Sequence, residues 1–212
     1  ALNHRDVLQA AGGIDRDHEA NFVMFAMVAR DDPGLQILPM HRIIHNLSEH
    51  FTIGRLVATA SEFSWQRCSV EDADVADAGS FLHRYGPGAM AFVGALPAEV
   101  WIAKLKDPGA MVQAAPDQPD AWRNLDVAIL HKLIIDRALE AWRTPDLFID
   151  YTPDGRSVMA ACESSRAHLG VFLRSTPLEA VERIARAGAV MPYKSTYFYP
   201  KMATGMVLKG LE

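Results

Sequence analysis

The sequence has little cysteine, and its cysteines form no recognisable pattern. Cys68 and Cys162 are the only two, and they show neither a disulfide framework nor the spacing of a zinc site. This usage is typical of proteins in a reducing compartment, so we expect a cytoplasmic protein. Each thiol is expected to lie in the core as a small hydrophobic side chain.

Long hydrophobic runs are also missing. No apolar segment approaches the roughly 20 residues that a bilayer-spanning helix needs, and no signal peptide is recognisable. We therefore expect no membrane partner.

Basic charge is not in excess. The chain has 21 lysines and arginines against 26 acidic residues, which gives a formal net charge of −5. Nucleic-acid binding usually needs a basic face, so this balance disfavours a nucleic-acid partner, although a local basic patch is left open. Half of the 212 residues are hydrophobic, which is enough for the core of one large domain or two small ones.

The first residues lack a helix start signal. Residues 1–11 read as a helix from the first position, no capping residue precedes them, and Gly12 and Gly13 end the pattern. We expect that upstream sequence is missing and that the chain is the C-terminal fragment of a larger protein, an incomplete domain without its N-terminal part.

Short strand and helix patterns alternate along the chain, which predicts an α/β or α+β fold with a mixed sheet flanked by helices. Residues 107–120 contain three prolines and are the one candidate for a loop or subdomain junction. The expected strands are 22–29, 35–38, 90–96, 100–104, 147–151, 169–173 and 206–208. The expected helices are 48–60, 69–85, a long helix capped by Asn124, 157–165, and one that starts with a capping box at 176–179 and ends at Gly188.

The clearest candidate for a binding site is the segment 191–201. Pro192 and Pro200 bracket it and restrict the backbone, so we expect an ordered loop. Ammonium groups, hydroxyls and backbone amides in one loop can hold a phosphate or a carboxylate. The alternative is a solvated basic turn whose tyrosines pack on the core. The predicted phosphate-binding residues of this loop are Lys194, Ser195, Thr196 and Lys201.

His41 and Arg42 follow the expected strand 35–38 and form the second candidate. Arginine can bind phosphate with two parallel hydrogen bonds, and histidine can act as an acid or a base near neutral pH. The alternative is that His41 packs at the core edge and Arg42 forms a surface ion pair. His41 and His45 have the spacing of two metal ligands on a helix, but Pro39 and the β-branched pair 43–44 argue against a helix, so we expect no metal site.

Other polar residues are weaker candidates for a functional site. His131 is expected on the solvated side of its helix, and Asp72, Asp74 and Asp77 do not share a helical face. The sequence has no nucleophile elbow, no Walker-type loop and no dinucleotide-binding glycine pattern. Local motifs therefore leave the reaction undefined.

Three blocks resemble a protein family. Residues 191–201 are similar to the C-terminal signature of the bacterial and archaeal domain-of-unknown-function family ten-fifteen, and residues 31–42 and 125–131 resemble two further blocks. The blocks occur in the family order and span nearly the whole chain, although Tyr193 stands where proline is commoner. The family resembles the ParB/sulfiredoxin superfamily, and its best-known block, Gly-His-His-Arg-Tyr, would lie immediately before Ala1.

The resemblance implies a phosphate or nucleotide site and a small-molecule kinase of the serine-kinase type, because related members bind nucleotide phosphates and some phosphorylate free serine. It implies ATP or ADP with magnesium as cofactors and a small phosphorylated or nucleotide ligand as partner. Two alternatives stay open: a non-enzymatic DNA- or protein-binding module, and an inactive fragment that lacks the main phosphate-binding turn. In the kinase hypothesis Lys194 and Lys201 neutralise charge, Ser195 and Thr196 donate hydrogen bonds, Arg42 is a clamp and His41 is the catalytic base.

Overall fold

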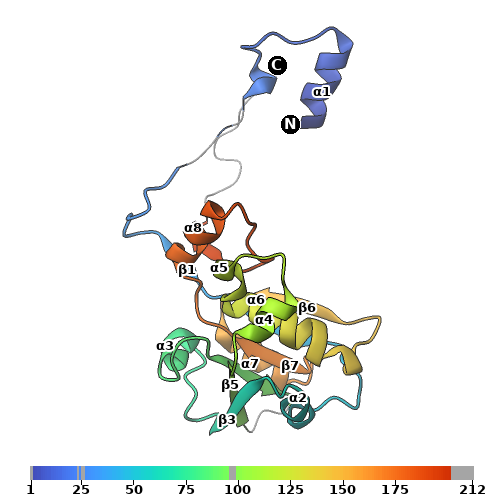
Figure 1. The fold of residues 1–212 in the computed structure, drawn as a ribbon, viewed down its shortest axis with the longest axis vertical. Helices are drawn as coiled ribbons and strands as arrows, with labels where there is room; N and C mark the ends of the chain where they lie inside the picture. The colour runs from blue at the N-terminus through green and yellow to red at the C-terminus, as the bar shows by residue number, and fades with distance from the viewer. Residues whose placement is uncertain (1, 23, 25–26, 96–98, 202–212) are drawn as a thin grey trace. The chain divides into compact units, whose positions relative to one another are not determined.

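The computed structural model describes residues 2–22, 24, 27–95 and 99–201, and the chain divides into two compact units. One unit comprises residues 37–198, and the other comprises residues 1–36 with residues 199–212. Figure 1 labels the main elements. In chain order they are α1 (Leu2–Ala11), η1 (Glu19–Asn21), β1 (Gln36–Leu38), β2 (His41–His45), α2 (Ile53–Thr59), β3 (Phe63–Ser69), α3 (Ala78–His83), β4 (Met90–Gly94), β5 (Glu99–Leu105), α4 (Gly109–Ala114), α5 (Asp120–Arg123), α6 (Asp126–Ile129), η2 (Leu130–Ala138), η3 (Glu140–Trp142), β6 (Phe148–Thr152), α7 (Gly155–Glu163), β7 (Leu169–Phe172), α8 (Leu178–Arg186) and β8 (Tyr197–Tyr199).

A six-stranded sheet forms the centre of the unit 37–198. Its strand order is β3-β5-β4-β7-β2-β6, and each of its ladders is antiparallel. Strands β1 and β8 pair in a second, two-stranded sheet. The prediction of an α/β or α+β fold with a sheet flanked by helices is confirmed, and the antiparallel ladders make it the α+β type. The predicted sheet was mixed, whereas the described ladders of the central sheet are all antiparallel.

Helices cover both faces of this sheet. Alternate side chains of a strand point to opposite faces, so one strand can contribute to the core on each face. In β4, Met90 and Phe92 pack under α4, α6 and η2, whereas Ala91 and Val93 pack under α3 and α7. Helix α7 approaches the sheet closely at Gly170 of β7, where an added Cβ would lie 2.5 Å from a side-chain atom of α7. The molecule therefore has a core on each face of the sheet.

The expected helix 69–85 is much shorter in the structure. Ser69 belongs to β3, where it pairs with Glu99 of β5, and its hydroxyl accepts a hydrogen bond from the Asp72 amide in the turn that follows. Asp77 caps α3 instead, because its carboxylate accepts the Ser80 amide. The helix therefore starts after Asp77, a strong capping residue in the middle of the expected helix, and not after Ser69.

The expected strand 22–29 is wrong for the residues that the structure describes there. Phe22, Met24 and Met27 lie outside any strand and are 51, 53 and 93% exposed. Hydrophobicity alone does not form a strand when no neighbouring strand supplies a hydrogen-bonded ladder. The expected strand 206–208 lies outside the described residues.

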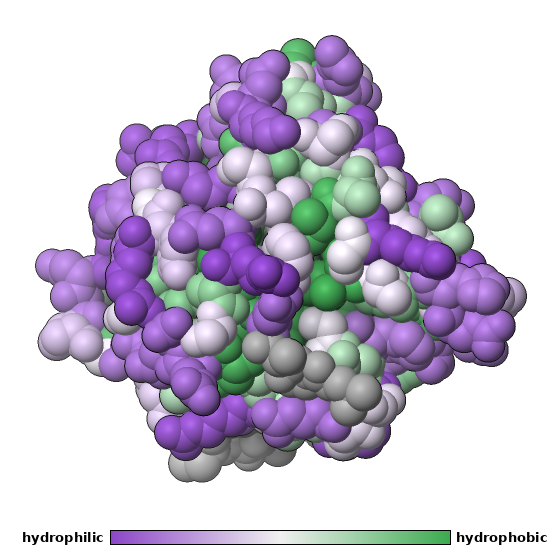
Figure 2. All heavy atoms as spheres, turned by 90° about the horizontal axis from the view of Figure 1, so that it is seen from below, coloured by the Kyte–Doolittle hydropathy of each residue, from purple (hydrophilic) through white to green (hydrophobic). Residues whose placement is uncertain are grey.

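Helix α1 ends as the sequence predicted. Gly13 adopts a left-handed φ of +79°, and its amide donates to the Gln9 carbonyl across the last turn. None of the helices in the described part of the chain has the length and hydrophobicity to cross a membrane. On the face shown in Figure 2, hydrophobic residues form small areas separated by hydrophilic side chains.

Candidate functional site

Arg42 lies at the centre of the predicted site and is fully buried. Strand β2 places it on the same face as Ile44, and its exposed fraction is 0%. The Nη1 group donates to the Met40 carbonyl, and Nη2 donates to the Lys194 carbonyl at 3.0 Å. The guanidinium carbon lies 4.7 Å from the centre of the Tyr151 ring. Carbonyl oxygens and an aromatic face therefore surround the charge.

His131 of η2 completes these contacts. Arg42 Nε donates to His131 Nε2 at 3.4 Å, so this ring nitrogen carries no proton. Burial, reinforced by the charge of Arg42, lowers the pKa of His131 to about 4. Burial also lowers the pKa of Arg42 to about 10, which leaves it charged at neutral pH. The expectation that His131 faces solvent is wrong, because its ring is half-buried against Arg42 of β2.

His41 lies on the opposite face of β2 and is 1% exposed. Its Nδ1 accepts the Leu173 amide at 3.2 Å, and its ring lies 5.4 Å from that of Phe172. Burial, followed by the charge of Arg42, lowers the pKa of His41 to about 4. His41 is thus a neutral core histidine, and its catalytic role stays a prediction.

The predicted loop is ordered against the sheet. The Tyr193 ring contacts the Tyr151 ring edge-on at 5.6 Å, and the Lys194 carbonyl accepts from Arg42. Lys194 adopts a left-handed φ of +52°, which costs a lysine roughly 1 kcal/mol. The structure therefore brings the loop and Arg42 together through a backbone carbonyl.

The side chains of the loop point to several places. The Lys194 side chain is exposed and its Nζ lies 5.6 Å from the Tyr193 ring centre. Ser195 is buried and Thr196 is half-buried. Lys201 is exposed and belongs to the other unit. Phosphate binding by these residues stays a prediction.

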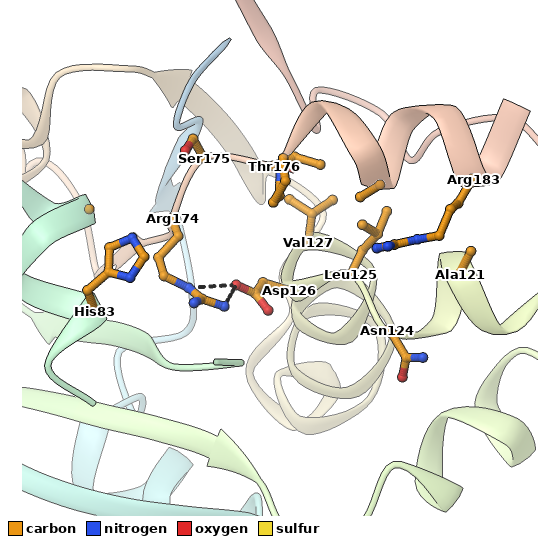
Figure 3. A pocket seen from close by; sticks show the side chains of 13 residues that line it. His83, Ala121, Asn124, Leu125, Asp126, Val127, Arg174, Ser175, Thr176 and Arg183 are labelled. Atoms are coloured by element: carbon orange, nitrogen blue, oxygen red, sulfur yellow. Dashed lines mark hydrogen bonds and ion pairs between the residues drawn. The ribbon is translucent and has the colours of Figure 1, made fainter. Parts of the chain in front are cut away.

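A cavity of about 570 Å³ lies next to this loop. Segments of α3, α5, α6, α8 and the connection from β7 to α8 line it, and Figure 3 shows it from close by. We name it the Arg183 cavity. Its polar and charged side chains include His83, Asn124, Asp126, Arg174 and Arg183.

A half-buried ion pair lies in the wall of the Arg183 cavity. Arg174 donates to Asp126 Oδ2 from Nη2 at 3.0 Å and from Nε at 3.3 Å, and these side chains are only 19 and 18% exposed. Burial raises the pKa of Asp126, and the charge of Arg174 opposes that rise. Both bonds end on Oδ2, so Oδ1 has no hydrogen-bond partner among the described residues.

Arg183 adds a positive charge that this ion pair does not balance. Figure 3 shows its side chain reaching from α8 towards Leu125 at the cavity wall. His83 lies near Arg174 in the same view. Guanidinium groups match the geometry of phosphate and carboxylate oxygens. The arrangement can therefore bind an oxyanion beside a carboxylate that has a free oxygen.

Thr176 connects this cavity to the predicted loop. It lines the Arg183 cavity, and its hydroxyl donates to the Ser195 carbonyl at 2.9 Å. The sequence located the loop but not the cavity residues. The available signal was their position at element ends, since Asp126 begins α6, His83 ends α3 and Arg174 follows β7.

Residues 1–128 match the model of the family described as Protein of unknown function (DUF1015). Because this match covers more than half of the chain, the protein belongs to that family. The match includes Asp126 but ends before Arg174, Arg183 and the loop 191–201. No curated protein matches the chain.

Solved structures with a similar fold include a mutant of a free serine kinase in complex with AMP. Its TM-score is 0.48 at 11% identity, and the match covers 82% of this chain and 57% of that chain. A conserved hypothetical protein from Pyrococcus furiosus gives a TM-score of 0.45 at 12% identity, with 82% of this chain and 60% of that chain covered. The chain thus spans less than two thirds of the length of either structure.

Proposed function

We propose that this protein binds a small phosphorylated molecule, with a nucleotide as the first candidate, and acts as a small-molecule kinase. The observation that supports it is the Arg183 cavity, whose described lining combines two guanidinium groups and His83 with one half-buried carboxylate, that of Asp126. Phosphoryl transfer depends mainly on positioning and on neutralising charge, which such a site supplies.

In this proposal Arg183 and Arg174 bind phosphate oxygens, and Asp126 is the proton acceptor. A hydroxyl of the second substrate gives its proton to Asp126 Oδ1 while its oxygen bonds to phosphorus and the bond to the leaving nucleotide breaks. A raised pKa suits a carboxylate to this role. We propose Asp126 ahead of His41 because His41 Nδ1 is engaged by the Leu173 amide.

The loop 191–201 and magnesium have supporting roles. Arg42 would position the loop through the Lys194 carbonyl, while Lys194, Ser195 and Thr196 would contribute donors to the ligand. Magnesium would be held mainly by the phosphates of the ligand, because Asp126, the carboxylate in the described lining of the Arg183 cavity, is the proton acceptor in this proposal. The relation to the ParB/sulfiredoxin superfamily is part of the same proposal.

Calorimetric titration with AMP, ADP, ATP and inorganic phosphate tests this proposal. Arg183→Gln should weaken nucleotide binding roughly tenfold or more, because it removes a charge-assisted hydrogen bond. Arg186→Gln is the matched control. It removes the same charge from the same helix, and Arg186 is exposed like Arg183 but does not line the cavity.

Lys194→Ala reports on the loop in the same titration. Loss of binding in this variant alone would place the anion at the loop, whereas equal binding by all three variants and the parent protein would contradict the proposal. Salt-dependent binding of duplex DNA in place of nucleotide would favour the non-enzymatic module.

A further inference from the structure

A second cavity of about 300 Å³ adjoins the first one. The two share Asn124, Asp126 and Arg174 as lining residues. The second cavity is lined in addition by Lys104 and Arg123, and we name it the Lys104 cavity. Its volume is at the lower end of the range for small-molecule sites.

Lys104 is one of the residues that line this cavity. Its Nζ donates to the Tyr85 carbonyl at 3.1 Å, and an ammonium group has two further N–H donors. Gly88, which also lines this cavity, has a left-handed φ of +76°, and a Cβ added to it would meet nothing within 4 Å. Gly88 therefore borders open space in the cavity wall.

Arg123 has a donor without a partner. Its Nε is buried and makes no hydrogen bond within the described structure, although Nη1 donates to the Ala115 and Pro116 carbonyls. Its ion-pair partner Asp120 is 84% exposed, so water screens that pair. Arg123 therefore contributes to the cavity lining a positive charge whose ion-pair partner lies in solvent.

We infer that the Lys104 cavity is a second oxyanion site, which takes a phosphate or carboxylate group. Lys104 and Arg123 supply two positive charges, while the only carboxylate in its lining, Asp126, is already paired with Arg174. With both cavities filled, Arg174 lies next to both anions. The inference extends the proposed function but rests on Lys104 and Arg123, which do not line the Arg183 cavity, so either can fail without the other.

Calorimetry with inorganic phosphate and, separately, malonate tests this inference on the full chain. We expect two phosphates per chain, one of which is lost or weakened roughly tenfold or more in Lys104→Gln. Lys106→Gln is the matched control, because Lys106 Nζ likewise donates to a carbonyl, that of Ser61 at 2.9 Å, but does not line the cavity. If malonate displaces this phosphate, the site accepts carboxylates. If malonate does not displace it, the site is specific for phosphate.

A second pair of variants guards against misfolding of Lys104→Gln. Gly88→Asp adds a negative charge at the cavity wall and should weaken the same phosphate, whereas Gly88→Asn should not, and both residues tolerate a positive φ better than most. Equal binding by Lys104→Gln and Lys106→Gln would overturn the inference. A single bound phosphate per chain that is lost in Arg183→Gln would also overturn the inference. That outcome would leave the proposed function intact.

Discussion

Arg42 keeps its positive charge in the core although no carboxylate in the described part of the chain pairs with it. The Met40 and Lys194 carbonyls, His131 Nε2 and the Tyr151 ring take the place of a counterion. A positive charge on a nearby histidine would repel the buried guanidinium, and no carboxylate among the described residues pairs with Arg42 to offset it. The uncharged state of the nearby histidines is therefore a condition for the stability of this region.

Stability should fall in mild acid for this reason. The pKa of His41 and of His131 is about 4 in the folded protein against a reference value of 6.5, so the unfolded chain binds these protons more readily. The contribution is complete above pH 6.5 and is lost as the pH falls towards 4, with a slope of up to about 1.4 kcal/mol per pH unit for each histidine. Urea unfolding at several pH values measures this slope.

His131→Gln should flatten that dependence, whereas His50→Gln should not, because the His50 side chain is 75% exposed. An unchanged slope in His131→Gln would show that acid acts through other groups.

At the scale of elements, Thr176 shows how tertiary contacts override a local pattern. The capping box at 176–179 predicts that Thr176 caps the helix, yet α8 begins at Leu178 with Pro177 at the cap position and no side-chain cap bond. The Thr176 hydroxyl instead donates to the Ser195 carbonyl. The pattern located the helix correctly but assigned the hydroxyl to the wrong partner.

Thr176→Val should therefore loosen the loop and not the helix. We expect a loss of roughly 1 kcal/mol in the free energy of unfolding, together with faster amide exchange at residues 193–196. Thr52→Val is the control: Thr52 caps α2 by accepting the Arg55 amide at 3.2 Å, so a similar loss of stability should leave exchange in the loop unchanged. Faster exchange in both variants would mean that global unfolding causes it.

Much of the fold could be predicted because its signals are local. Residues 147–151 and 169–173 match β6 and β7 closely, and Gly188 follows α8 as expected. His131 was misplaced because its contact with Arg42, which is distant in the sequence, forms only through the fold. The site was harder to predict. Asp126 and Arg174 come together only in the folded protein, and neither lies in a sequence motif that indicates a cavity.

At the scale of the whole molecule, both cavities lie within one compact unit. All their lining residues fall inside residues 37–198, as do the six strands of the central sheet. This unit contains both hydrophobic cores of the sheet. Ligand binding should therefore depend on this unit alone.

A polypeptide of residues 37–198 should fold cooperatively and bind phosphate as the full chain does. Circular dichroism melting and calorimetry measure the two properties. The same experiment tests the predicted role of Lys201, which lies outside these residues. A folded polypeptide with clearly weaker binding would assign part of the site to Lys201 or its neighbours.

The Arg183 cavity is assembled from α3, α6 and α8, which are far apart in the sequence. The unfolded chain cannot hold these three helices around one anion, so only the native state gains from occupancy. An anion at a hundredfold excess over its dissociation constant would add about 2.7 kcal/mol to the free energy of unfolding. The abundance of the ligand in the cell would then set how long the protein survives proteolysis.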